Sequence, residues 1–187
     1  MRLPTLPRTR TSAPACARCA VTALFPTLIA GPALAGEVAM SVQIPRLDVS
    51  EYHRPYVAIW LEGEDGTALA NLAVWYDVRK KEGEGGAKWL KDMRQWWRRI
   101  GRETDLPLDG ISGATKPVGA HALSFPADSA PFAGLKPGRY EIVVEAAREV
   151  GGREVLRLPV SWPPREAARA DAQGGSELGA VSVSLKP

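Results

Sequence analysis

The chain has 187 residues, enough for one domain with a substantial core, and it carries 24 basic and 21 acidic residues. Four of the arginines fall within the first 35 residues, and without that segment the balance is 20 basic to 21 acidic residues. The remaining chain is therefore close to neutral, which argues against a protein that binds nucleic acid or an anionic membrane surface.

An export signal is predicted over residues 1–35. Its basic residues are Arg2, Arg8, Arg10 and Arg18. An apolar run from Ala20 to Leu34 follows, and Ala33-Leu34-Ala35 supplies the small residues of a signal-peptidase site, so we expect cleavage before Gly36. Cys16 and Cys19 leave with this segment, so the mature domain of residues 36–187 has no cysteine for a disulfide, a thiolate nucleophile or an iron–sulfur cluster.

Seven strands are predicted from apolar runs and from the alternation of apolar and polar side chains. They cover residues 38–44, 56–61, 69–78, 121–125, 140–146, 156–162 and 181–185. Asp65-Gly66 marks a hairpin turn, and the last hairpin is expected to bury one face, with Glu141 and Glu145 on the other. Residues 163–175 are expected to form a loop, with a short helix as the alternative. The pattern predicts an all-β fold, an antiparallel β-sandwich of the immunoglobulin-like or fibronectin-like type.

One helix is predicted as an insertion between strands, over about residues 87–100. Apolar residues recur there at helical spacing, at Leu90, Met93, Trp97 and Ile100. Gly101 follows as the expected C-terminal stop. The structural interpretation of the tryptophans in this segment is that they fasten the helix onto the sheet.

The candidate functional stretch is Asp109-Gly110-Ile111-Ser112-Gly113-Ala114-Thr115-Lys116, within an irregular connection of about residues 104–120. Its small residues leave the backbone open to close approach, and successive N–H groups in such a turn form an anion-binding concavity beside the Lys116 cation. This favours a phosphate, either bound by the loop or attached through the Thr115 hydroxyl. The alternative is a plain turn, because Asp-Gly is a common turn dipeptide and Ser-Gly-Ala-Thr occurs by chance in many loops.

The pattern Asp-x-x-Ser-Gly-Ala-Thr resembles the flavin-attachment motif of the FMN-binding domains of sodium-pumping quinone reductases and Rnf-type electron-transfer complexes. In those domains an ApbE-type flavin transferase splits FAD and leaves FMN on the threonine as a phosphoester. The resemblance implies that Thr115 is the acceptor, that Asp109 is the acidic residue the transferase requires, and that Ser112-Gly113-Ala114 is the approach path. The chain departs from the motif after the threonine, where Lys116-Pro117 stands in place of a further Ser or Thr.

The wider sequence, with the Trp-rich segment from Trp89 to Arg99 and strands on both sides, resembles a family of small bacterial periplasmic proteins known as the domain of unknown function 2271. Members of that family are grouped with extracytosolic flavin carriers, often beside PepSY-type membrane proteins. The resemblance implies a periplasmic electron carrier with covalent FMN, rather than an enzyme acting alone, that exchanges electrons with a PepSY-type or other membrane redox protein.

Three side chains outside the motif are candidate flavin contacts. An isoalloxazine ring stacks well on indole, which makes Trp96 and Trp97 candidates beside their structural interpretation. His121 lies six residues past Thr115 and is a weaker candidate, with a surface or hydrogen-bonded role as the default. The two histidines offer no helical metal pair, and Glu62, Glu64 and Asp65 lack the spacing of a calcium loop, so no metal site is predicted.

Two other functions compete with the carrier. A hydrolase would use Ser112 or Thr115 as nucleophile and Lys116 as base, but Ser-x-x-x-Lys is one residue longer than the Ser-x-x-Lys of penicillin-binding enzymes, and neither their partner motifs nor a Gly-x-Ser-x-Gly elbow is present. The other alternative is a periplasmic binding or adaptor β-sandwich without a cofactor. No catalytic residue is assigned under either the carrier or the adaptor hypothesis.

Overall fold

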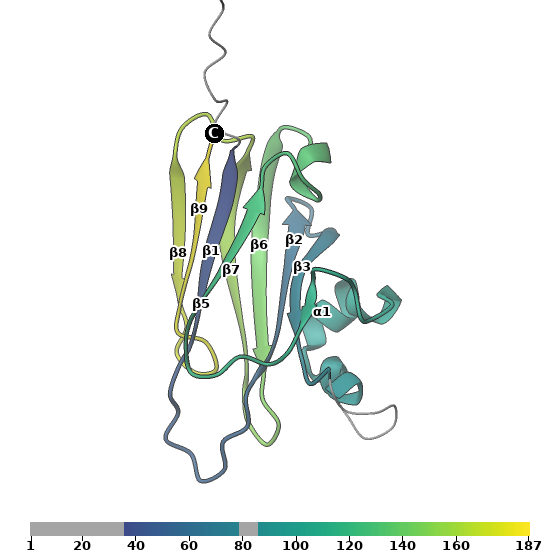
Figure 1. Ribbon diagram of the computed structural model, residues 1–187, viewed down its shortest axis with the longest axis vertical. Coiled ribbons are helices and arrows are strands. Elements are labelled where there is room, and N and C mark those ends of the chain that lie inside the picture. Colours follow the sequence, from purple (N-terminus) through teal and green to yellow (C-terminus); the bar gives the residue numbers. More distant parts are fainter. Residues whose placement is uncertain (1–35, 79–85) are drawn as a thin grey trace, which may run out of the picture. The chain divides into compact units, whose positions relative to one another are not determined.

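The computed structural model in Figure 1 describes residues 36–78 and 86–187, so the predicted signal peptide of residues 1–35 lies outside the described residues. The strands are β1 (Glu37–Ile44), β2 (Tyr56–Gly63), β3 (Ala68–Trp75), β4 (Ser112–Gly113), β5 (Gly119–Pro126), β6 (Gly138–Ala147), β7 (Arg153–Trp162), β8 (Ala168–Gln173) and β9 (Ala180–Lys186). The helical segments are η1 (Gly86–Asp92), α1 (Arg94–Arg99), η2 (Gly101–Glu103) and η3 (Phe132–Gly134).

The strands form two sheets, which confirms the predicted β-sandwich. The first sheet has the order β5-β1-β9-β8 and the second has the order β4-β3-β2-β6-β7. Neighbouring strands are antiparallel, except that the short β4 runs parallel to β3. The main core lies between the sheets and takes its large side chains from the inner faces of both, including Val42, Ile59, Ile142 and Leu158.

Each of the seven predicted strands is present, and two further strands occur. Residues 163–175, expected to be a loop, contain β8, which pairs with β9 at the edge of the first sheet. The apolar residues of β8 that pack against the core are only Ala170 and Ala172, and alanine gives a weak signal of strand periodicity. The other addition is β4, a two-residue strand inside the candidate motif.

The second sheet is buried on both faces. Strand β6 directs Ile142 and Val144 into the main core, whereas Val143 and Ala147 join a second core on the outer face of the sheet. The expectation that the last hairpin would bury a single face was therefore wrong, and Glu145 is fully buried. The reason is that the helical insertion, seen beside β2 and β3 in Figure 1, covers this outer face.

The insertion is not the single helix predicted over about residues 87–100. A 3-10 segment, η1, is followed at Met93 by one short α-helix, α1, and then by the 3-10 turn η2. The predicted stop at Gly101 is close to the end of α1 at Arg99. Besides following the end of the helix, Gly101 packs against Trp96. A Cβ atom at residue 101 would lie 2.6 Å from Cε3 of that indole. The chain can pass over the buried indole only because residue 101 has no side chain.

Buried carboxylates on the outer face of the second sheet are satisfied by the side chains and backbone around them. Glu62 accepts a hydrogen bond from Trp60 Nε1 at 2.8 Å and from Arg157 Nη1 at 2.7 Å. Glu145 accepts one from Arg153 Nη1 at 2.9 Å. These pairings offset the cost of removing two carboxylates from water, and they link β2 and β6 to β7.

Candidate functional site

The candidate motif is fastened to the free edge of the second sheet. Its middle, Ser112–Gly113, forms β4 and pairs with the end of β3. The carbonyl of Ile111 accepts the backbone N–H of Val74 at 2.9 Å, and the carbonyl of Gly113 accepts that of Tyr76 at 2.9 Å. The backbone on both sides of Ser112 is therefore fixed by the sheet, and the residues before and after it leave this edge as loops.

A tight turn precedes β4 and places Asp109 and Gly110 at an exposed tip. The backbone N–H of Ser112 donates to the Leu108 carbonyl at 2.8 Å, and Ser112 Oγ accepts the Leu108 N–H at 2.9 Å. Gly110 has a φ of +72° and open space around it, so glycine meets a backbone requirement. The Ser112 hydroxyl thus closes a turn, which disfavours the reading of Ser112 as a nucleophile.

Trp75, at the end of β3, contacts the motif and the residues that follow it. A Cβ atom on Gly113 would sit 3.5 Å from Trp75 Cδ1, so the glycine lets β4 pass close to the indole. Lys116 Nζ lies 5.4 Å from the centroid of the same ring, and the His121 ring meets it edge-on at 5.9 Å between centroids. The sequence pattern predicts a strand at Trp75 but no part for it in the site, because only the fold brings β3 beside the motif.

His121 has the hydrogen-bonded role expected as its default. Its Nε2 donates to the Pro117 carbonyl at 2.7 Å, which closes the bend between Lys116 and β5. Together with its contact on Trp75, this bond makes His121 a positioning residue for the segment that follows Thr115. Thr115, Lys116 and His121 therefore lie close together at one end of the sandwich.

Thr115 is half-buried and lines a cleft of about 260 Å³ at the end of the sandwich where β2 begins and β3 and β6 end. The other lining residues come from the β1–β2 connection, the segment after β3 and the β6–β7 turn, and are Tyr52, His53, Arg54, Tyr56, Asp77 and Glu149. Thr115, the predicted acceptor residue, is therefore not part of the core. It borders a recess that mixes aromatic rings with charges of both signs.

The Tyr56 side chain in this cleft is partly buried and lies near three carboxylates. Burial, followed by the nearby carboxylates of Asp77, Glu149 and Asp92, raises the pKa of the Tyr56 phenol to about 12. The phenol therefore stays neutral at physiological pH and remains a hydrogen-bonding group. Glu149 also faces His53, whose Nδ1 lies 3.9 Å from its Oε2.

The two helical tryptophans named as flavin contacts lie away from this cleft. Trp96 is fully buried, and its Nε1 donates to Asn71 Oδ1 at 2.7 Å. Trp97 is half-buried against the same outer core, with its ring 6.2 Å from that of Trp96. The structure therefore assigns Trp96 the fastening role and leaves it no exposed face on which a flavin ring can stack.

A second recess, of about 440 Å³, lies on the other side of the motif. The turn residues Leu108, Asp109, Gly110 and Ile111 form one wall, and Asn71, Leu72, Phe125 and Pro131 are among the residues of the other. This recess is largely apolar and opens between the β4 edge of the second sheet and the β5 edge of the first. Asp109 stands exposed at its rim, accessible to an enzyme that approaches the motif.

The composition of the Thr115 cleft suits a phosphate-linked aromatic group. Tyr52 and Tyr56 supply rings, Arg54 supplies a cation, and Asp77 and Glu149 supply carboxylates that disfavour a phosphate beside them. A phosphoryl group on Thr115 would be favoured by the Arg54 cation that lines the same cleft and by Lys116, the next residue in the chain. Among the described residues no group of three or more His, Cys, Asp or Glu side chains is placed to hold a metal ion.

The fold and the site define a β-sandwich that presents one threonine on an edge loop, beside a mixed aromatic and charged cleft. The chain belongs to the family described as "Predicted periplasmic protein (DUF2271)", whose model matches residues 37–180. This match confirms the family resemblance and supports a periplasmic location. Neither the curated proteins nor the solved structures gave a match. Within residues 36–78 and 86–187, no helix has the length and apolar character that crossing a bilayer requires.

Proposed function

We propose that this protein is a periplasmic electron carrier that holds FMN covalently, through a phosphoester to Thr115. The observation that carries the proposal is the placement of Thr115: it is a half-buried residue that lines a cleft, on a loop that the sheet fixes at β4. A modifying enzyme needs access to the acceptor oxygen, and a bound cofactor needs a neighbouring recess. Thr115 meets both requirements.

The attachment would be made by an ApbE-type flavin transferase acting on the exported chain. The Thr115 Oγ1 attacks the phosphorus of the FMN half of FAD, the bond between that phosphorus and the bridging oxygen of the pyrophosphate breaks, and AMP leaves with that oxygen. The hydroxyl proton passes to a base of the transferase. The exposed Asp109 stands in the same loop, at the position of the acidic residue that the motif requires of its substrate.

The flavin, when bound, supplies the redox chemistry, and the protein supplies its placement and surroundings. Lys116, held over Trp75, and Arg54, in the cleft, would neutralise the phosphoester charge. Covalent linkage suits a periplasmic carrier, because a flavin lost outside the cytoplasm is not readily replaced. The partners in electron transfer would be a PepSY-type or other membrane redox protein on one side and an extracytosolic acceptor on the other.

The test is the mass and colour of the exported protein made together with a flavin transferase. We expect a yellow protein with a fluorescent band on a denaturing gel and a mass equal to the chain from Gly36 plus FMN less water. Thr115→Val keeps the branched shape and replaces the hydroxyl by a methyl group, so it should abolish the fluorescence and the added mass. Thr115→Ser should retain part of both. A colourless wild type with the mass of the cleaved polypeptide would favour the cofactor-free binding or adaptor sandwich instead.

A further inference from the structure

Exposed apolar side chains gather at the end of the sandwich that carries Thr115. Six large hydrophobic residues of the described chain are exposed, and five of them lie in connections at this end: Val49, Tyr52, Val78, Val118 and Val150. Figure 1 shows these connections together below the sheets, opposite the end where β1 begins and β9 finishes. A single exposed valine is ordinary, but a group around one candidate acceptor indicates a surface that something covers.

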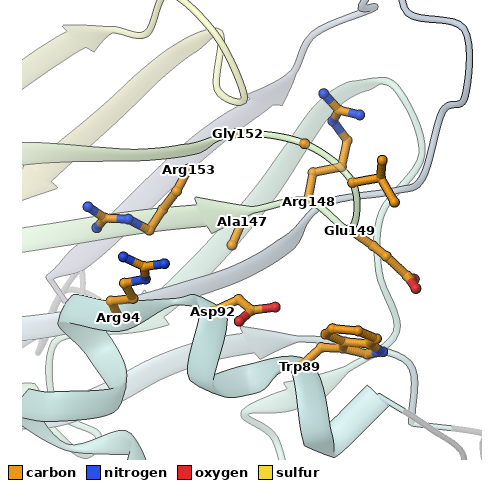
Figure 2. A pocket seen from close by; sticks show the side chains of 10 residues that line it. Trp89, Asp92, Arg94, Ala147, Arg148, Glu149, Gly152 and Arg153 are labelled. Carbon is orange, nitrogen blue, oxygen red and sulfur yellow. The ribbon is translucent and has the colours of Figure 1, made fainter.

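The Thr115 cleft and a larger recess share one lining residue, Glu149. This larger recess, of about 520 Å³, lies between η1 and the tip of the β6–β7 hairpin. Its lining residues are Trp89, Asp92, Arg94, Ala147, Arg148, Glu149, Val150, Gly151, Gly152 and Arg153. Glu149 lines both spaces. Figure 2 shows its side chain pointing from the hairpin tip toward Trp89 on the opposite wall. We call the two spaces together the Thr115–Trp89 groove.

We propose that the isoalloxazine ring of the FMN on Thr115 lies in this groove and stacks on Trp89. The inference rests on the proposed function and adds to it the place of the ring and the residue that contacts it. Tyr52 and Val150, at the rim of the groove, are exposed apolar groups that the ring would cover. The phosphoester stays at the mouth beside Thr115, and the ring passes Glu149 to reach the indole.

Trp89 is the tryptophan that the structure offers for this contact. It is half-exposed and lines the groove, whereas Trp96 is fully buried and Trp97 lines neither recess. Lys88 Nζ lies 4.9 Å from the centroid of the Trp89 ring and adds positive charge at the same wall. An indole with an accessible face stacks on a flat heteroaromatic ring and quenches its fluorescence by contact.

Charged groups line the far part of the groove. Figure 2 shows Arg94, on the α1 side, close beneath Arg153 on β7, and Arg148 turned away from both. Arg153 is paired with Glu145 and Arg148 with Glu177, each at 2.9 Å, whereas the exposed Arg94 faces the recess. A guanidinium at this position suits the electron-rich edge of a flavin, whose negative charge grows on reduction.

The experiment measures flavin fluorescence per attached flavin in the exported, flavin-loaded full chain. Mass spectrometry first gives the fraction of chains that carry FMN, so that brightness is normalised to cofactor. We expect the native wild type to be quenched relative to the same protein in denaturant, and Trp89→Phe to lose most of that quenching with its flavin content unchanged. Trp97→Phe is the matched control, a tryptophan of the same insertion outside the groove, and should stay as quenched as the wild type.

The outcomes separate this inference from the proposed function. A wild type without attached flavin overturns both. Attached flavin that is equally bright in the wild type and in Trp89→Phe overturns only the place of the ring. If Trp89→Phe does not accumulate, iodide quenching of the wild type decides: an attached flavin shielded from iodide supports the groove, and one as accessible as free FMN overturns it.

Discussion

The carboxylate of Glu145 on strand β6 accepts the backbone N–H of Trp96 in helix α1 at 2.7 Å. Its other oxygen accepts the N–H of Gln95 at 3.1 Å and pairs with Arg153 at 2.9 Å. Helix α1 has only six residues and no capping side chain of its own, so the sheet supplies the acceptor for its first turn. The insertion that forms one wall of the Thr115–Trp89 groove is therefore positioned by a buried charge on the strand beneath it.

Replacement of Glu145 should lower the free energy of unfolding strongly, because one carboxylate accepts three hydrogen bonds. Glu145→Ala would leave two backbone N–H groups and Arg153 without their acceptor, so we expect a loss of about 3 kcal/mol in the free energy of unfolding. Urea unfolding of the purified domain measures it. Asp171→Asn, in the exposed pair with Arg169, is the control and should change stability by less than about 1 kcal/mol. Equal effects of the two changes would contradict the capping role.

The contact of Gly101 with Trp96 gives a second stability prediction. In Gly101→Ala the added methyl carbon would lie 2.6 Å from the buried indole, so the ring or the backbone has to shift, and we expect a loss of about 1–3 kcal/mol in the free energy of unfolding. Gly134→Ala is the matched control, since nothing lies within 4 Å of its added carbon. Thermal unfolding of both variants tests the difference. A Gly101→Ala protein as stable as the control would show that Trp96 repacks easily.

The sequence predicted a strand correctly where it shows either a clear alternation of apolar and polar residues or a continuous apolar run. The alternation from Val38 to Ile44 predicted β1, and the apolar run from Tyr56 to Leu61 predicted β2, because a buried face or a buried strand needs those residue types. Strand β8 was missed because its inward residues are alanines. The broken helix was missed because its pattern fits one helix through Met93, and only the sheet below, with Glu145 as cap, decides where α1 begins.

The candidate site was only partly readable from the sequence. The turn at Gly110 and the accessibility of Thr115 follow from local composition, since small residues favour an exposed bend. The roles of Trp75, Trp89 and Glu149 depend on which segments the topology brings to the same end of the sandwich. That proximity is a long-range property, so no local pattern could have indicated it.

Replacement of Asp109 tests the attachment motif without an expected change in the stability of the fold. Asp109 is exposed at the tip of its turn, so Asp109→Asn should leave the thermal midpoint unchanged while attached flavin falls to a small fraction of the wild-type level. Asp105→Asn, an exposed carboxylate in the same connection but outside the motif, is the matched control and should load normally. The flavin mass peak and gel fluorescence of the exported proteins measure loading. Normal loading of Asp109→Asn would contradict the role that the resemblance implies.

Tyr56 should report on the cleft through its titration. Burial and the carboxylates of Asp77, Glu149 and Asp92 raise its pKa to about 12 from the ordinary tyrosine value of about 10. Because the folded state holds the phenolic proton more tightly than the unfolded state, the stabilisation is fully present below pH of about 10 and is lost as pH rises through about 12. Titration of tyrosinate absorbance in the folded protein should therefore show a late step that Tyr56→Phe removes. Glu149→Gln takes away one of the charges that raise the pKa and should move this step to lower pH. A late step that Glu149→Gln leaves in place would contradict the contribution of the Glu149 carboxylate and would leave burial and the other carboxylates, Asp77 and Asp92, to hold the proton.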